Sequence, residues 1–350
     1  MDDNDTPVRG SDNMVSQPSQ NANSYDIIDI GGSKLRDYLL AALQRDFLNK
    51  KDPEVPYVSD IFTSSDEGLE LWSTITSLPT WYQTREEIDL LRRWGPDIAK
   101  HVRPGTSLVD LGSGDVKKIT PLLECLEAQE FGVTYYCVDL SRASIAHGLE
   151  TLSARRYRHI TLVGLWGTFD AAKLYLDQIA SPRFLASLGA EIGNDTFDSA
   201  RADLASWAAK MRPGDQLLLG LDGTRDKTKI WKSYHHSDVH RFIRTGMASV
   251  NATLPSPWFR DEDWVLDGEI RTYPEEFSHR FFFTALRPVS CPEAGVSFSP
   301  GDRFECCESH RKTPAEMRVI FKACGLNEIQ FWKSPVGDMY EYLLVLQDEP

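Results

Sequence analysis

The feature that most constrains the fold is a run of alternating strand-like and helical segments between residues 106 and 222. Predicted strands are "SLVDL", "VTYYCVDL", "HITLVGLW", "RFLASLGAEI" and "DQLLLGLDG", with helical segments such as "TPLLECLEAQ", "SRASIAHGLETLS" and "DSARADLASWAAKM" between them. Repeated strand–helix units produce parallel strands with helices on both faces of the sheet. The sequence therefore predicts an α/β fold with a doubly wound sheet.

The segments on either side of this run predict a second lobe. Residues 1–24 are polar and contain no apolar signal core, which predicts a disordered tail rather than an export signal. Helices follow, and we expect breaks at Pro79 and Pro96. After Asp222 the alternation stops, and "WVLDGEIRTY" and "SHRFFFTALR" resemble antiparallel strands. The expected division is a tail at 1–24, a helical part of the substrate lobe at 25–85, the doubly wound core at 86–224, an inserted substrate-binding lobe at 225–310, and a return to the core through a helix and hairpin at 311–350.

The charge and cysteine content exclude several classes of function. The formal net charge is −14 and the pI is about 5.1, which argues against nucleic acid and against an anionic membrane surface as partners. No apolar run is long enough to span a bilayer. Six cysteines without a CxxC pair predict reduced thiols and a cytoplasmic location. The histidines at 235, 236 and 240 lack the partners of a zinc site, so we expect no metal.

A glycine turn follows the first predicted strand of the core. The turn Gly112-Ser113-Gly114 allows backbone to approach a ligand closely, but Lys117 stands where a dinucleotide fingerprint has its third glycine. Asp139 ends the next strand and can accept both hydroxyls of a ribose. Lys118 offers a cation for a carboxylate, or is a solvated surface lysine. A glycine turn, a cation and an acid in this order predict S-adenosylmethionine as the cofactor.

Later strand ends add further candidates. Phe169 is either an adenine-stacking ring or a core phenylalanine, and Thr168 or a backbone group would meet the edge of the adenine. Asn194 offers donors and acceptors for the groups of an amino acid, or caps the following helix. The predicted cofactor-binding set is Gly112, Ser113, Gly114, Lys118, Asp139, Leu140, Thr168 and Phe169.

Seven motifs occur together in an order typical of one family. They are "LPTWYQTREE", "VDLGSGDVKKI", "YYCVDLS", "GLWGTFD", "LGAEIGN", "LLLGLDGTRDKTKIWKSY" and "CCESHRKTPAEM". From about residue 25 to the C-terminus, the chain resembles the histidine-specific, ergothioneine-type S-adenosylmethionine-dependent N-methyltransferases. "YYCVDLS" and "GTFD" resemble the fungal branch, which includes dimethylallyltryptophan N-methyltransferases. The resemblance implies a Rossmann-like methyltransferase sheet with a second α+β substrate-binding lobe.

The resemblance also implies an acceptor site, and this chain departs from the family there. Trp81 stands where the histidine enzymes have a tyrosine, and Cys307 stands where they have a glutamate. Glu308 is adjacent, but a shift of one residue on a strand turns a side chain to the other face. As alternatives, Trp81 is a core aromatic and Cys307 a buried filler. The implied substrate-binding set is Trp81, Tyr82, Asn194, Tyr234, Cys307, Glu308 and Ser309.

These departures predict an aromatic or prenylated aromatic amino acid as the substrate, because the pocket becomes flatter and more apolar. Tyr234 is the expected catalytic proton acceptor or relay, with a bound water as the alternative, and Asn194 would hold the amino or carboxylate group. Three alternatives stay open: another methyl acceptor (oxygen, sulfur or protein), histidine Nα-methylation, and a non-catalytic binding relative. The expected partner is a small-molecule amine. The sequence gives no indication of whether the protein forms oligomers.

Overall fold

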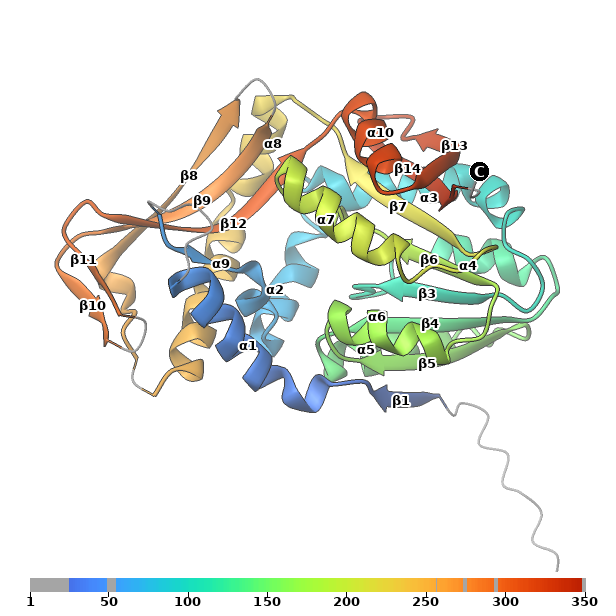
Figure 1. The fold of residues 1–350 in the computed structure, drawn as a ribbon, viewed down its shortest axis with the longest axis horizontal. Coiled ribbons are helices and arrows are strands. Elements are labelled where there is room, and N and C mark those ends of the chain that lie inside the picture. The colour runs from blue at the N-terminus through green and yellow to red at the C-terminus, as the bar shows by residue number, and fades with distance from the viewer. Residues whose placement is uncertain (1–24, 49–54, 256, 273–275, 293–294, 348–350) are drawn as a thin grey trace, which may run out of the picture.

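A computed structural model describes residues 25–48, 55–255, 257–272, 276–292 and 295–347. Its largest element is an eight-stranded sheet with the strand order β1-β5-β4-β3-β6-β7-β14-β13 (Figure 1). In that order the strands are Asp26–Asp29, Ile160–Trp166, Val133–Asp139, Ser107–Leu111, Arg183–Ser187, Gln216–Asp222, Met339–Leu346 and Leu326–Lys333. The predicted tail at residues 1–24 lies outside the described residues.

The topology is that of a doubly wound sheet. Strands β1, β5, β4, β3, β6 and β7 are parallel, and β14 and β13 join antiparallel beyond β7. The strand order reverses next to β3, and ligands of such sheets bind beyond the carboxyl ends of the strands at this point. The predicted α/β fold is therefore confirmed. The domain division stays a prediction, although β1, from the segment we expected in the substrate lobe, pairs with β5 of this sheet.

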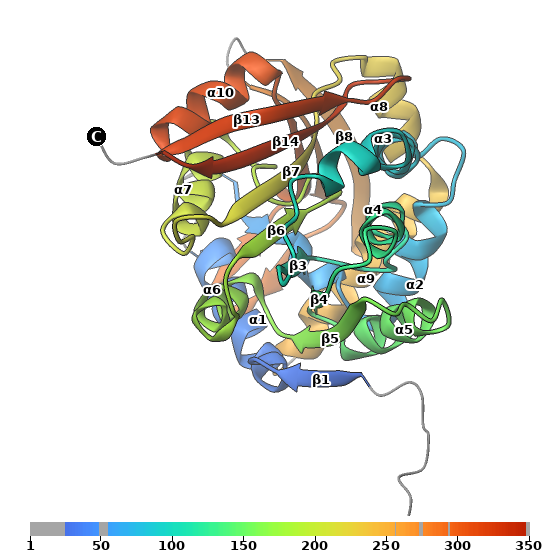
Figure 2. The ribbon, with the colours of Figure 1, turned by 90° about the vertical axis from the view of Figure 1, so that its right-hand side faces the viewer.

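Helices cover both faces of the large sheet (Figure 2). The apolar sides of one set of helices pack on one face of the sheet, and those of a second set pack on the opposite face. The first set is α3 (Tyr82–Ala99), α4 (Thr120–Glu127) and α5 (Arg142–Ser153), and the second is α6 (Phe169–Tyr175), α7 (Phe197–Ala208) and α10 (Pro314–Ala323). In the part of the chain that the structure describes, no helix is both long and apolar enough to cross a membrane.

The predicted break at Pro96 is wrong, because α3 continues through it to Ala99. A proline inside a helix removes one backbone hydrogen bond. Here the residue lies near the end of the helix, and Leu90, Leu91 and Ile98 are fully buried on either side of it. The packing of this apolar stripe therefore outweighs the lost bond.

The second lobe is built around a four-stranded sheet with the order β2-β12-β9-β8. Figure 1 shows this sheet beside the edge at which the parallel strands of the large sheet end. Its core is rich in aromatic side chains. Its strands are Tyr57–Val58, Arg303–Arg311, Phe277–Ala285 and Trp264–Thr272, with a hairpin of β10 (Val289–Cys291) and β11 (Val296–Phe298). The helices of this lobe are α1 (Leu35–Leu43), α2 (Asp66–Ile75), α8 (Lys227–Tyr234) and α9 (Ser237–Thr253).

Short helical turns occur in both parts of the chain. They are η1 (Gly32–Lys34), η2 (Gln44–Leu48), η3 (Asp60–Thr63), η4 (Leu176–Gln178) and η5 (Asp261–Asp263).

Candidate active site

The glycine turn and the predicted ribose acid meet beyond the ends of β3 and β4. Gly112 and Gly114 have left-handed backbone angles, with φ of 72° and 53°, which glycine adopts without strain. The Gly114 N–H donates to Oδ2 of Asp139 at 3.0 Å, and the Ser141 N–H donates to Oδ1 at 2.9 Å. The glycine turn and the Asp139 carboxylate, which the sequence predicted to act together, are therefore in direct contact.

Asp139 is held in one orientation by those two backbone N–H groups. Its side chain is almost fully buried, and burial raises the pKa of the carboxyl group above its usual value. Each carboxylate oxygen has a second lone pair. The arrangement can therefore accept two further hydrogen bonds, as from a vicinal diol.

Two more candidates lie next to the turn. The half-buried ring of Phe169 reaches over Gly112, where an added Cβ would lie 3.4 Å from its Cζ. Thr168 caps α6 and accepts a hydrogen bond from the Ala171 N–H at 3.2 Å. We call Gly112, Gly114, Asp139 and Phe169 the strand-end edge.

Ser113 and Leu140 contribute differently. The Ser113 hydroxyl turns into the sheet, 2.7 Å from the Cys137 sulfur, so its side chain does not face the strand-end edge. The side chain of Leu140 is half-buried, and its carbonyl accepts a hydrogen bond from Trp166 Nε1 at 2.9 Å. Leu140 therefore joins β4 to β5 through its backbone.

Lys118 is paired rather than a freely solvated surface lysine. Its Nζ lies 3.7 Å from Oε2 of Glu87, a fully buried side chain on α3. Glu87 Oε1 accepts the Gly189 N–H at 2.6 Å. A Cβ on Gly189 would collide with Lys118 Nζ, so glycine there makes room for the ammonium group. Glu87 thus links α3 both to Lys118 and to the loop after β6.

A second polar group, which we call the Tyr234 cluster, lies in the small-sheet lobe and consists of Trp81, Gln83, Tyr234, Ser309 and Arg311. The Tyr234 hydroxyl donates to Ser309 Oγ at 2.8 Å. It accepts from Gln83 Nε2 at 3.1 Å and from Arg311 Nη2 at 2.9 Å. Trp81 is buried and packs edge-on to the Tyr234 ring, with 5.2 Å between the two ring centroids. The cluster therefore has its hydroxyl in a fixed position beside an indole wall.

Arg311 anchors the cluster from behind. Its buried guanidinium pairs with Asp222 at 2.9 Å and donates to Ser309 Oγ at 2.6 Å. The Tyr82 hydroxyl donates to the same Asp222 carboxylate at 2.5 Å. The structure therefore places Tyr82, a predicted substrate residue, behind the cluster, in a buried network.

Strand β12 carries a bulge at Cys307. Cys306 pairs with Phe281 and Glu308 pairs with Arg280, so Cys307 is the extra residue, and its φ is 48°. The half-buried Cys307 thiol has a raised pKa because of a hydrogen bond with Cys306 and burial. A bulge redirects side chains and often accompanies a functional site.

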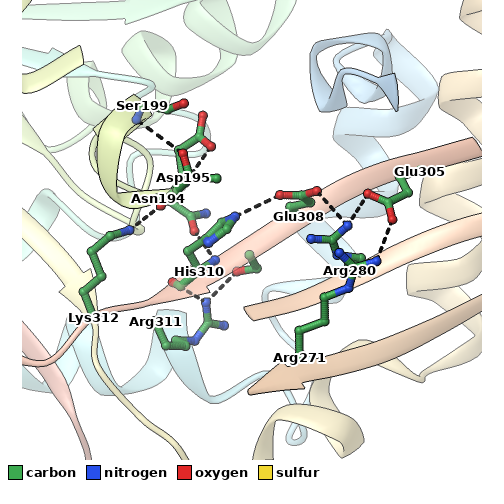
Figure 3. Close-up of polar contacts among 12 residues, drawn as sticks. Asn194, Asp195, Ser199, Arg271, Arg280, Glu305, Glu308, His310, Arg311 and Lys312 are labelled. Atoms are coloured by element: carbon green, nitrogen blue, oxygen red, sulfur yellow. Dashed lines mark hydrogen bonds and ion pairs between the residues drawn. The ribbon is translucent and has the colours of Figure 1, made fainter. Parts of the chain in front are cut away.

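The bulge separates Glu308 from the Tyr234 cluster. Glu308 lies 2.9 Å from His310 Nε2 and 3.6 Å from Arg280 (Figure 3). Ser309, between Glu308 and His310, contacts Tyr234 instead. Glu308 and Ser309 therefore belong to opposite faces of the small sheet.

Asn194 connects the two lobes. Its Oδ1 accepts the His310 N–H at 2.7 Å (Figure 3). Lys312 donates to the Gly193 carbonyl at 3.2 Å. Thr196, rather than Asn194, caps α7. Asn194 thus lies in the loop between β6 and α7 and against β12, and the capping alternative is excluded.

One group of side chains in this region has metal-ligating atoms. Atoms of Asp195, Glu308 and His310 lie within 4.8 Å of one another. His310 and Glu308 are hydrogen-bonded to each other. The histidine at 235, considered from the sequence, instead contacts His279 with Nε2 atoms 3.1 Å apart.

The family model described as histidine-specific, S-adenosylmethionine-dependent methyltransferase matches residues 35–346. The chain belongs to this family. The family predicted from the motif order is therefore confirmed, and so is S-adenosylmethionine as its methyl donor.

Curated fungal relatives fall into more than one group. The chain is 30% identical over 347 residues to the 4-dimethylallyltryptophan N-methyltransferase easF of Claviceps purpurea, covering 91% of this chain and 98% of the relative. It is 26% identical over 324 residues to ergothioneine biosynthesis protein 1 of Neurospora crassa, covering 91% of this chain but only 36% of the relative. It is 26% identical over 302 residues to the N-methyltransferase imqF of Aspergillus flavus, covering 83% of this chain and 80% of the relative.

The strand-end edge fits the methyl donor of this family. Glycine at position 112 leaves the space between the turn and Phe169 open, and a larger residue would narrow it. The Asp139 carboxylate is oriented with acceptor capacity left over. The residues that would hold the donor are Gly112, Gly114, Asp139, Leu140, Thr168 and Phe169.

Sequence reasoning missed the residues that hold the site from behind. Arg311, Asp222 and Gln83 orient Tyr234 and Ser309, and Glu87 orients Lys118. A single charged residue inside a strand or helix forms no sequence pattern from which its distant partner could be predicted. A charged residue within a predicted buried strand, such as the arginine of "CCESHRK", was the one available indication.

Proposed function

We propose that this chain transfers the methyl group of S-adenosylmethionine to the amino nitrogen of an amino acid or an amino-acid-derived aromatic small molecule. The observation that carries the proposal is the contact of Asn194 with the His310 N–H. It joins the loop after β6, which lies beside the strand-end edge, to the strand that carries Ser309. Donor and acceptor sites would thus share one boundary.

Asn194 and Tyr234 would position the acceptor. Asn194 uses its oxygen on β12, and its Nδ2 donates no hydrogen bond to a described residue. It can therefore donate to an acceptor carboxylate. The Tyr234 hydroxyl has three partners, Ser309, Gln83 and Arg311, so it is held at a fixed point. Tyr234 would therefore act in positioning, and the proton relay predicted for it from the sequence would require one of these three bonds to break.

Positioning and exclusion of water would supply most of the rate enhancement. When bound, S-adenosylmethionine supplies a methyl group on a sulfonium that is open to attack by an amine. The Trp81 indole packs against Tyr234, and the Cys307 side chain packs against the same aromatic core, so both add apolar surface to this lobe. Such a surface favours the neutral amine over its hydrated cation.

An aromatic amino acid is the proposed substrate class. The indole of Trp81 and the thiol of Cys307 offer no carboxylate or phenol to an imidazole. The nearly full-length similarity to a 4-dimethylallyltryptophan N-methyltransferase supports this choice. We also propose a cytoplasmic location, supported by six free thiols, with neither nucleic acid nor a membrane as a partner, supported by the net charge of −14.

A screen with isotope-labelled S-adenosylmethionine tests the proposal. The acceptors are tryptophan, 4-dimethylallyltryptophan, tyrosine derivatives and histidine. The expected result is label on the α-nitrogen of an aromatic acceptor, located by fragmentation mass spectrometry. Label on oxygen or sulfur, or no transfer to any acceptor, would contradict it, and preferred methylation of histidine would overturn the substrate class.

A further inference from the structure

Glu191 occupies a distinctive position in the loop that follows β6. A Cβ added to Gly112 would lie 3.8 Å from Glu191 Cγ and 3.4 Å from Phe169 Cζ, so both side chains lie over the glycine turn. The loop is held in this shape by left-handed residues, with φ of 88° at Gly189 and 59° at Ala190. Left-handed backbone at a non-glycine residue costs free energy and clusters at functional sites.

The Glu191 carboxylate has no hydrogen-bonding partner among the described residues of the protein. Its side chain is exposed, and within the described ranges it makes no hydrogen bond or ion pair. The other carboxylates at this end of the sheet are engaged: Asp139 with two backbone N–H groups, and Glu87 with Gly189 and Lys118. Glu191 is therefore a carboxylate of the strand-end region with both oxygens available to a ligand, whereas Asp139 has only the lone pairs that its two backbone contacts leave over.

Charged groups from several elements face Glu191. Asp60 on η3 of the small-sheet lobe, Asp139 at the end of β4 and Glu87 on α3 are negative, and Lys118 is positive. The Glu191 side chain is accessible to water, yet the protein atoms around it partly desolvate the carboxylate. This desolvation, followed by the repulsion from Asp60, raises the pKa of the Glu191 carboxyl to about 7. The negative surroundings also favour a cation beside it.

Tyr234 is poorly placed to accept a proton. Its oxygen accepts from Gln83 and Arg311, and its own proton is donated to Ser309. A phenol oxygen with two donors has no free lone pair for an ammonium group. A different group must take the proton before the nitrogen can react.

We infer that Glu191 binds the ammonium group of the acceptor and accepts its proton. The inference rests on the proposed function and names the base for that reaction. In this step an N–H bond breaks and an O–H bond forms on the carboxylate, and the electron pair remains on nitrogen, ready to attack the methyl carbon. The carboxyl group then loses its proton to water, and the same cycle serves a second methylation.

The test compares Glu191→Gln with Glu150→Gln, an exposed control on α5. The acceptor is whichever amino acid of the screen the wild-type enzyme methylates fastest. In the wild type, kcat/KM should rise with pH through about 7 as Glu191 ionises. Glu191→Gln should lose this inflection and about 100-fold or more in kcat, the usual contribution of a general base. Glu150→Gln should retain both.

Two binding measurements complete the test. At pH 7, where part of Glu191 carries a proton, calorimetry in two buffers of different ionisation enthalpy should show that the acceptor ammonium displaces this proton when it binds the wild-type complex with S-adenosylhomocysteine, and that Glu191→Gln releases none. The affinity for S-adenosylhomocysteine itself should be unchanged, which also shows that the variant folds. An unaltered pH profile, or weakened S-adenosylhomocysteine binding, would overturn the inference. Absence of any methyl transfer by the wild type would instead overturn the proposed function.

Discussion

The strand-end edge and the Tyr234 cluster are built by opposite means. At the edge, backbone geometry does most of the work, since two left-handed glycines and two backbone N–H groups shape the turn and orient Asp139. In the cluster, side chains orient one another, and the buried Arg311 holds Tyr234 and Ser309. A site of backbone turns can stay constant while a site of side chains changes, which is the division expected between a shared cofactor and a variable acceptor.

The largest effect should follow from removing the anchor of the Tyr234 cluster. Arg311→Leu leaves Asp222 as a buried charge without its partner. Loss of one member of a buried ion pair costs about 3–5 kcal/mol of folding free energy. Urea unfolding measures this, with Arg318→Leu, which breaks an exposed pair with Glu328, as the control. Equal losses in the two variants would contradict an anchoring role for Arg311.

Asp139→Ala should disrupt the strand-end edge and weaken binding of the methyl donor. Two hydrogen bonds to a charged acceptor contribute about 1.5–3 kcal/mol each, so affinity for S-adenosylmethionine should fall roughly 100-fold or more. Asp198→Ala, an exposed change at the start of α7, is the control. Calorimetry showing unchanged affinity for the Asp139 variant would refute the ribose assignment.

Tyr234→Phe should have a smaller effect, confined to the acceptor. It removes the hydroxyl that Ser309, Gln83 and Arg311 share. Losing such a bond and leaving its donors unpaired costs about 1–3 kcal/mol. We expect KM for the acceptor to rise roughly tenfold. A fall in cofactor affinity of the same size would remove the distinction between the two regions.

The smallest effect should come from Trp81→Tyr combined with Cys307→Glu. These changes restore a phenol at position 81 and a carboxylate at position 307, which should raise the relative kcat/KM for histidine about tenfold at most. Cys307 lies on a bulge with φ of 48°, which limits how well a new glutamate is aimed. Competition between histidine and tryptophan measures the change, and an unchanged ratio would reject this account of specificity.

The sequence predicted the strand-end edge better than the Tyr234 cluster. Strand–helix alternation and the spacing of Gly112, Gly114 and Asp139 are local patterns, and parallel strands bring their ends together. The bulge at Cys307 depends on pairing with β9, and the burial of Arg311 depends on Asp222 from a distant strand. Long-range pairings of this kind leave no periodic signal in one sequence.

The most direct test of this division is a crossed binding experiment on Asp139→Ala and Tyr234→Phe. Calorimetry would measure S-adenosylhomocysteine binding first, and then acceptor binding in its saturating presence. The account predicts that Asp139→Ala weakens the nucleoside ligand and that Tyr234→Phe weakens the acceptor alone. Equal weakening of both ligands by both variants would contradict it.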